Sequence, residues 1–367
     1  MQNFNNKKIL LAPLDWGLGH TTRCILVIKK LIDKGNSVTV ACNYRQKAIL
    51  FQEFPKIEFL YLEGYNVSYS NNKFFLPLKL IGQLPKINYR IYQEHKWLQK
   101  TVKKHDFDIV ISDNRFGLYS KLVPTVFITH QLTIKAPFSW LECLLQRINY
   151  SYINRFNQCW VPDYEGSRNM AGLLSHPQKL PSIPIHYIGP LARFKSPIHS
   201  SDIYTYKYCF ILSGPEPQRT ILEHLILSQI HFITTNCLLV RGIPDNDKDE
   251  VKIDSSFVTI KNHLKGTELE EAIVHSEYII TRSGYTSVME LISLQKKTIL
   301  IPTPGQTEQE YIGQELMIQK WAFCVNQDNF NLEESLKKAS GFDYQLPSFD
   351  DNNLDLFITK FLQSLSN

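Results

Sequence analysis

A histidine and an aspartate flank a glycine-rich turn near the start of the chain, where residues 15–20 read Asp-Trp-Gly-Leu-Gly-His. An imidazole titrates near neutral pH, so His20 is suited to removing a proton from an attacking hydroxyl group, and Asp15 is the alternative base. Gly17 and Gly19 let the backbone approach a ligand, and a helix that follows such a turn attracts an anion such as a diphosphate at its amino end. The alternative interpretation is that His20 caps this helix and has no chemical role.

A second polar cluster lies at residues 281–290, which read Thr-Arg-Ser-Gly-Tyr-Thr-Ser-Val-Met-Glu after an apolar run. Glu290 falls about two turns into the predicted helix, where its carboxylate can accept hydrogen bonds from the two hydroxyls of a ribose. Gln309 and Glu310 follow the next predicted strand. Because polar groups at the carboxyl ends of neighbouring parallel strands form ligand sites, this cluster is predicted to bind a nucleotide.

Two further turns of the C-terminal half carry groups suited to a diphosphate. Ser213-Gly214 follows one predicted strand and leads into a helix that carries Arg219, and Arg241 ends the next strand. Backbone N–H groups and guanidinium groups both bind phosphate oxygens. Each turn also fits an ordinary structural loop between a strand and a helix.

These residues depend on a sheet that holds their turns at one edge. The apolar run at 8–14, the periodic stretch at 24–32 and the run at 37–41 predict a strand, a helix and a parallel strand. Lys34-Gly35 ends that helix with a usual stop signal. Further strands are predicted at 57–62, 109–112, 125–129, 158–161, 186–188, 208–212, 237–240, 257–260, 278–281 and 298–301, and helices near 217–229, 267–276, 284–294 and 307–319.

Length and pattern together predict two doubly wound α/β domains, since 367 residues exceed one ordinary core. A proline-containing segment without periodicity marks the linker. The predicted parts are an N-terminal Rossmann-like domain at 1–190, a linker at 191–206, a second α/β domain at 207–345, and a C-terminal helix at 346–367 that packs back on the first domain.

Composition excludes several classes of protein. No apolar run reaches the ~20 residues of a membrane span, the N-terminus has no signal-peptide pattern, and the seven scattered cysteines have no metal-site or disulfide spacing, so we expect a cytoplasmic protein without a bound metal. Lys plus Arg number 24 against 12 Asp plus Glu in residues 1–190, and 16 against 23 in residues 191–367. The first half, at +12, is expected to meet an anionic surface or acceptor. No nucleic-acid-binding module is present.

The glycine turn differs from a dinucleotide fingerprint. Thr22 or Arg23 stands where the third small residue belongs, and no acidic residue follows the second strand at 41–43. A nicotinamide-dependent dehydrogenase is therefore disfavoured.

The chain resembles the GT-B glycosyltransferases related to the peptidoglycan enzyme that adds N-acetylglucosamine to lipid-linked muramoyl pentapeptide, a family 28-like group. The resemblance is strongest at Arg282-Ser283-Gly284 with Glu290, followed by Pro302 and Gln309. It implies two Rossmann-like domains facing a cleft, a ribose bound by Glu290, and donor hydroxyls bound near Gln309. It also implies that the domain at 1–190 binds the acceptor, at the glycine turn and at Thr129-His130-Gln131, and that the domain at 207–345 binds the nucleotide-sugar donor. Helix N-termini and arginines can stabilise the leaving diphosphate, so no metal is expected.

The candidate residues thus fall into three sets. The catalytic candidates are His20 and Asp15. The acceptor-binding candidates are Gly17, Gly19, His130 and Gln131. The donor-binding candidates are Ser213, Gly214, Arg219, Arg241, His263, Arg282, Ser283, Gly284, Thr286, Glu290, Gln309 and Glu310.

Several positions depart from the family pattern and indicate a relative with its own acceptor. Asp15-Trp16 replaces two glycines, residues 213–216 replace a Gly-Gly-Ser loop, and Glu310 with Gly313 replaces a glutamine and an asparagine at the sugar subsite. The lysine-flanked apolar stretch at 73–86 favours peripheral contact with the inner face of the plasma membrane, and a buried loop and helix is the alternative.

The expected activity is inverting transfer of a hexose, N-acetylglucosamine-like, from a UDP-sugar to a lipid-linked or glycan acceptor of the cell envelope. The alternatives are a nucleotide-sugar epimerase of the same fold and a catalytically silent nucleotide-sugar binding protein.

Overall fold

The computed structural model describes residues 6–65, 82–136, 138–194, 204–243, 253, 255–264, 266–348 and 353–365. These residues form two compact units, the second of which begins at Phe194. The first unit also includes the last helix of the chain. Residues 195–203 of the predicted linker and residues 73–81 of the predicted membrane segment lie outside the described residues.

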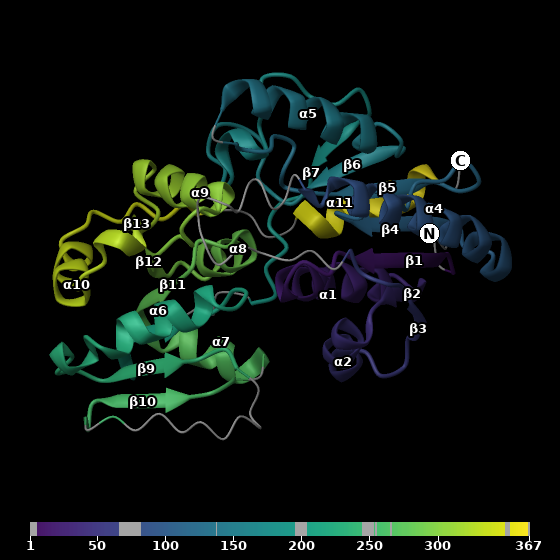
Figure 1. The fold of residues 1–367 in the computed structure, drawn as a ribbon. Coiled ribbons are helices and arrows are strands. Elements are labelled where there is room, and N and C mark those ends of the chain that lie inside the picture. The colour runs from purple at the N-terminus through teal and green to yellow at the C-terminus, as the bar shows by residue number, and fades with distance from the viewer. Residues whose placement is uncertain are drawn as a thin grey trace. The chain divides into compact units, whose positions relative to one another are not determined.

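The described residues of the first unit form a seven-stranded sheet in the order β3-β2-β1-β4-β5-β6-β7, and every pairing is parallel (Figure 1). The strands are β1 (Lys8–Pro13), β2 (Ser37–Cys42), β3 (Glu58–Tyr61), β4 (Ile109–Asp113), β5 (Thr125–Ile128), β6 (Gln158–Val161) and β7 (Ile185–Tyr187). The helical segments are α1 (Leu18–Asp33), α2 (Tyr44–Glu53), α4 (Leu84–His105), α5 (Ser139–Ile153) and the short η1 (Gly172–Leu174).

The strands of this unit are apolar along their whole length because helices cover both faces of a parallel sheet. Ile9, Leu10 and Leu11 on β1 are fully buried although their side chains alternate between the two faces. One side packs Leu10 with Leu98 of α4. The continuous apolar run at the start of the chain is therefore the central strand.

The second unit has a six-stranded parallel sheet among its described residues, in the order β10-β9-β8-β11-β12-β13. Its strands are β8 (Tyr206–Ile211), β9 (Cys237–Val240), β10 (Val258–Lys261), β11 (Ser276–Thr281), β12 (Lys297–Leu300) and β13 (Phe323–Cys324). Its helical segments are α6 (Gln218–Leu227), η2 (Ile230–Phe232), α7 (Gly266–Val274), α8 (Tyr285–Ser293), α9 (Thr307–Ile318), η3 (Gln327–Asn329) and α10 (Leu332–Ser340).

The chain ends with α11 (Asn353–Ser364), which belongs to the first unit and appears in yellow among its blue and purple elements in Figure 1. Asp355 accepts hydrogen bonds from Lys30 and Lys34 of α1, both at 3.1 Å. The rings of Phe357 and Phe361 meet the buried ring of Trp160 edge-on, with centroids 5.1 Å apart. Residues from the two ends of the sequence thus stabilise one sheet.

The fold class predicted from the sequence, two α/β units each built on a parallel sheet, is confirmed. Within the described residues, no helix combines the length and apolarity that crossing a membrane requires.

Candidate functional site

The first part of the candidate site lies where the strand order of the first sheet reverses, between β1 and β4. Ligands of open parallel sheets bind outside the carboxyl ends of the strands at such a point. Pro13 ends β1 and is paired with Asp113, the last residue of β4. The chain then turns through residues 14–17 into α1, whose first turn carries His20.

His20 and Asp113 form a hydrogen-bonded pair at this edge. The Nδ1 atom of His20 lies 2.9 Å from Oδ2 of Asp113, and the imidazole remains 15% exposed whereas the carboxylate is fully buried. When Nδ1 carries the proton and donates it to Asp113, Nε2 keeps a free lone pair. An imidazole oriented by a carboxylate in this way can act as a general base.

Burial contributes most to the low pKa of His20, and the positive charge of Arg23 lowers that pKa further, against the raising effect of Asp113. Burial alone would raise the pKa of Asp113, but the charges of Arg23 and His20 outweigh it and lower that pKa. At neutral pH the pair is therefore a neutral imidazole beside a carboxylate, which is the form a base needs.

Asp15, the alternative base, is engaged with the backbone of a neighbouring loop. Its Oδ1 atom accepts a hydrogen bond of 3.1 Å from the N–H of Tyr65. Its carboxylate also lies against Gly64, where a β-carbon would come within 1.8 Å of Oδ2. This geometry gives Asp15 a role in holding the 64–65 loop beside the turn.

The glycines of the turn shape the start of α1. Gly17 precedes the helix with a φ of 80°, a conformation that strains residues with a side chain. Gly19 lies inside the first helical turn, and its carbonyl accepts a hydrogen bond from the Thr22 hydroxyl. Among the predicted acceptor residues, His130 follows β5 and is almost fully buried, with its Nδ1 atom 3.3 Å from a terminal nitrogen of Arg23. Gln131 donates its backbone N–H to the Thr129 hydroxyl.

The second part of the candidate site lies at the carboxyl edge of the other sheet, around Arg282 directly after β11. This guanidinium is 2% exposed and donates to the carbonyls of Ile301 and Pro302, at 3.1 and 3.2 Å, and to that of Gln218 at 2.8 Å. Its Nε atom is buried without a hydrogen-bond partner among the described residues. Burial lowers the pKa of Arg282 to about 10, so the group keeps its charge at neutral pH.

Arg282 therefore joins three loops at one sheet edge. These are its own loop after β11, the loop that ends at Gln218 where α6 begins, and the loop at residues 301–302 after β12. In the part of the chain that the structure describes, no carboxylate lies within ion-pairing distance of Arg282. A buried, unneutralised cation is costly, and its field favours an anion at this edge.

The residues next to Arg282 build the adjoining loops. The Ser283 hydroxyl donates to the Gln309 carbonyl at 2.7 Å, and Gly284 precedes α8 with open space where a β-carbon would stand. The side chain of Gln309 accepts from the N–H of Thr303 at 2.9 Å and donates to Gln306 at 2.6 Å. Glu310 accepts from the N–H of Gly305 at 2.9 Å.

Gln309 and Glu310 thus hold the loop between β12 and α9 in this structure. Glu290 lies on α8 and is 7% exposed, Thr286 is half-buried in the first turn of that helix, and His263 is exposed after β10. Ser213 is half-buried and Gly214 is exposed with a φ of 112° after β8. All of these predicted residues follow the carboxyl ends of strands of the second sheet.

Arg219 and Arg241 form a buried ion-pair network with Glu223. Arg219 donates to Glu223 at 2.9 Å and to Glu216 at 2.5 Å, and Arg241 donates to the other oxygen of Glu223. Burial alone would raise the pKa of Glu223, but hydrogen bonds from both arginines outweigh it and lower that pKa. The two arginines predicted to bind a diphosphate therefore have much of their charge compensated within the protein, unlike Arg282.

Comparison with known proteins finds relatives of this chain by sequence and by fold. Residues 209–348 match the model of the glycosyltransferase family 28 C-terminal domain. An uncharacterized glycosyltransferase of Methanosarcina acetivorans is 24% identical in an alignment that covers 83% of this chain and 79% of that protein.

Two solved structures share the fold over nearly the whole chain. MurG of Acinetobacter baumannii has a TM-score of 0.60 at 12% identity, covering 98% of this chain and 99% of that chain. UGT2 of Phytolacca americana, complexed with UDP-2fluoro-glucose and pterostilbene, has a TM-score of 0.56 at 13% identity, covering 98% of this chain and 94% of that chain. The chain is a glycosyltransferase with the GT-B fold, and its residues 209–348 resemble the C-terminal domain of glycosyltransferase family 28.

Two residues of this glycosyltransferase that the sequence analysis did not select lie at the centre of the first part of the site. Asp113 ends a buried strand, and Arg23 falls three residues after His20 on the same helix. Asp113 could have been identified from the sequence as a polar residue at the carboxyl end of a predicted central strand. Nothing in the spacing of the sequence pairs it with His20, because 93 residues separate them.

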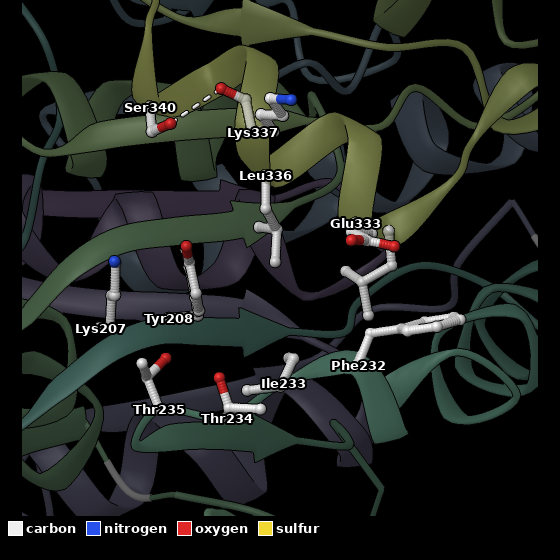
Figure 2. Close-up of a pocket in the computed structure, with 11 residues that line it drawn as sticks. Lys207, Tyr208, Phe232, Ile233, Thr234, Thr235, Glu333, Leu336, Lys337 and Ser340 are labelled. Carbon is white, nitrogen blue, oxygen red and sulfur yellow. Dashed lines mark hydrogen bonds between the residues drawn. The ribbon is translucent and has the colours of Figure 1, made fainter.

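A cavity of about 260 Å³ lies elsewhere on the second unit of this glycosyltransferase (Figure 2). Figure 2 shows Lys207 and Tyr208 of β8 opposite Leu336 and Lys337 of α10. Lys207 and Tyr208 begin their strand, so the cavity is at the amino edge of the sheet, opposite the edge that carries Arg282. We therefore assign the cavity no part in donor binding.

Proposed function

We propose that this glycosyltransferase moves a hexose, N-acetylglucosamine-like, from a UDP-sugar to a lipid-linked or glycan acceptor with inversion of configuration. The acceptor oxygen forms a bond to the anomeric carbon as the bond to the diphosphate oxygen breaks. The acceptor proton passes to Nε2 of His20, and the electron pair of the broken bond leaves with UDP. The C-terminal unit holds the donor, and the N-terminal unit activates the acceptor.

The observation that carries this proposal is the uncompensated guanidinium of Arg282 at the carboxyl edge of the second sheet. It donates to the first residue of α6 and lies directly before Ser283, Gly284 and α8. The amino ends of helices present unpaired N–H groups and a partial positive charge. Such an edge suits the diphosphate of a nucleotide-sugar, and Glu290 on α8 suits its ribose. The uridine and hexose follow from the resemblance of this cluster to the family signature, and the UDP-sugar bound by the plant enzyme is consistent with them.

The structure favours His20 over Asp15 as the base. His20 has a carboxylate behind Nδ1 and a partly exposed ring, whereas the carboxylate of Asp15 is held by the backbone of the 64–65 loop. Asp113 then acts as a positioning residue, because it holds the imidazole in the tautomer whose Nε2 is free.

We also propose that the leaving diphosphate is compensated by Arg282 and helix N-termini without a metal cofactor. A positive charge fixed before the reaction stabilises the negative charge that develops on the leaving group. Unchanged transfer in the presence of EDTA is the expected result, and a loss of transfer restored by a divalent cation would contradict it.

A lipid-linked acceptor is supported by an exposed apolar stripe on the first unit. Trp140, Leu144 and Ile148 are exposed at four-residue spacing on α5, and Phe138 is exposed just before them. Aromatic and aliphatic side chains on one helix face can enter the interfacial layer of a membrane, and the excess of basic residues in the first half favours anionic lipids. We place the enzyme on the cytoplasmic face of the plasma membrane, acting in synthesis of a cell-envelope glycan.

The proposal is tested by incubating the full chain with UDP-, dTDP-, GDP- and CMP-sugars and with lipid-phosphate and oligosaccharide acceptors. Binding of a UDP-sugar and formation of a product with inverted linkage are expected. Product formation in His20→Gln should fall by about 10²–10⁴-fold with UDP affinity retained. Failure of every nucleotide to bind, or epimerisation of the sugar without transfer, would overturn the proposal.

A further inference from the structure

Arg23 is a buried arginine on the same face of α1 as His20. Its side chain is 1% exposed, and its Nε atom donates to Oδ1 of Asp113 at 3.0 Å. A terminal nitrogen of the same guanidinium also donates to Oδ1, and Nε donates to Oδ2 at 3.2 Å, so the guanidinium contacts both oxygens of the carboxylate. The fork of an arginine fixes a carboxylate in one plane, so Arg23 determines how Asp113 faces the imidazole.

The same guanidinium competes with Asp113 for the imidazole. The Nδ1 atom of His20 lies 2.9 Å from the terminal nitrogen of Arg23 and 2.9 Å from Oδ2 of Asp113. If Nδ1 carries the proton, Asp113 accepts it and Nε2 is a free base. If Nδ1 accepts from Arg23, the proton is on Nε2 and the ring cannot remove another. The two neighbours therefore select opposite tautomers.

Among the residues that the structure describes, the charged and titratable groups around His20 come from three elements. Arg23 is on α1 with His20, Asp113 ends β4, and His130 follows β5. Cys24 on α1 hydrogen-bonds Asp113, and burial raises the pKa of its thiol well above the usual value. Asp113 is the carboxylate among them, and it contacts both His20 and Arg23. The negative charge of Asp113 favours a protonated imidazole, but the positive charge of Arg23 offsets most of that effect.

We propose that Arg23 is a positioning residue that sets the protonation state of His20: its charge keeps the imidazole neutral near pH 7, and its competition with Asp113 sets how much of the ring has a free Nε2. This inference rests on the proposed role of His20 as the base. The Arg23 effect on His20 can nevertheless be measured without transfer activity.

The direct test is an NMR titration of the full chain labelled with ¹⁵N in its histidines, in which the His20 signals are assigned by their loss in His20→Gln. Arg23→Gln removes the charge but keeps an amide that can donate to Asp113. We expect its His20 to titrate about one pH unit or more higher than in the wild type, since a nearby like charge shifts a pKa by this order. The ¹⁵N shifts should also show more of the tautomer protonated on Nδ1.

Two variants separate the charge from other effects. Arg23→Lys keeps a cation and should shift the His20 titration much less than Arg23→Gln. Lys30→Met removes a positive charge from the same helix, where the ammonium pairs with Asp355, and should leave the His20 titration unchanged. An unchanged titration in folded Arg23→Gln, or an equal shift in Lys30→Met, would overturn the inference.

The activity arm is the pH profile of kcat/KM. In Arg23→Gln the acid limb should move to higher pH, in parallel with the NMR titration, whereas a residue needed only for folding would lower the rate without moving the limb. If His20→Gln retains full glycosyl-transfer activity, His20 is not the base. The NMR titration still determines whether Arg23 controls the protonation of His20.

A further pair of variants keeps the inference testable if Arg23→Gln does not fold. The double variant Arg23→Gln with Asp113→Asn removes both buried charges together, so no unpaired ion remains. Compared with Asp113→Asn alone, it should raise the His20 titration, because the two proteins differ only in the guanidinium. Equal titrations in that comparison would contradict the proposal.

Discussion

Gly313 on α9 lies against Cys324 on β13, so closely that a β-carbon on Gly313 would come within 2.7 Å of the Cys324 Sγ atom. The same β-carbon would lie 3.1 Å from Cγ of Pro302. The resemblance described above implies an asparagine at this position, and the packing of this chain has no room for that side chain. The departure at Gly313 is therefore explained by the contact of α9 with β13.

Substitution of Gly313 by alanine is expected to destabilise the protein by about 1–3 kcal/mol, because overpacking outweighs the gain in helix propensity. Urea unfolding measures this change. Adding Cys324→Ala should restore part of the loss, since it removes the clashing sulfur. Gly284→Ala is the matched control: its φ is −68° and its β-carbon position is open, so the expected change in unfolding free energy is small.

Glu290→Ala should weaken binding of UDP by about 1–3 kcal/mol through the loss of charged hydrogen bonds to the ribose. Isothermal titration calorimetry gives the affinity. The control is Glu334→Ala on α10, which removes an exposed carboxylate of the same unit and should leave the affinity as it was. Equal affinities in Glu290→Ala and the wild type would argue against the ribose role.

Glu223→Gln is expected to cost about 3–5 kcal/mol of folding free energy, because it leaves the buried cations of Arg219 and Arg241 without their shared carboxylate. Glu216→Gln affects a mostly exposed partner of Arg219 and should cost much less. Denaturant unfolding of the two variants makes the comparison. Similar losses in both would contradict a central role of Glu223.

The buried neutral imidazole of His20 should make the protein less stable as the pH falls below about 6.5, the ordinary pKa of histidine. Because the pKa of His20 is lower in the folded state, the unfolded chain binds more protons in this window, and acidification therefore favours unfolding. One such group adds a slope of at most about 1.4 kcal/mol per pH unit. In His20→Gln the slope of the unfolding free energy against pH should be smaller, and an identical slope would show that His20 is not responsible.

Trp140→Ser should reduce binding to vesicles that contain anionic lipid by about tenfold, which corresponds to ~1.4 kcal/mol. Vesicle co-sedimentation at fixed salt measures the bound fraction. Tyr44→Ser removes another exposed aromatic side chain of the first unit, on α2, and should change binding little. Equal effects of the two substitutions would argue against α5 as the membrane contact.

The sequence alone determined the class of fold and predicted the turns that carry the candidate site. Continuous apolar runs predict strands covered on both faces, and the glycine turns between strands and helices predict ligand groups at one sheet edge. Cys237–Val240 and Gln158–Val161 were predicted with their observed bounds. These features are local, because the pattern of apolar and polar residues that are neighbours in the sequence predicts strand burial and helix periodicity.

Only the tertiary structure determined which of those residues form ion pairs and hydrogen bonds with one another. Asp113 meets His20 and Arg23 because β4 pairs with β1, and Glu223 compensates both Arg219 and Arg241 because α6 lies beside the end of β9. Arg282, predicted from its motif as a ligand group, holds three backbone carbonyls instead of a carboxylate. Contacts between side chains tens of residues apart in the sequence depend on the order of the strands and on distances of a few ångströms. Neither can be predicted from the spacing of residues in a single sequence.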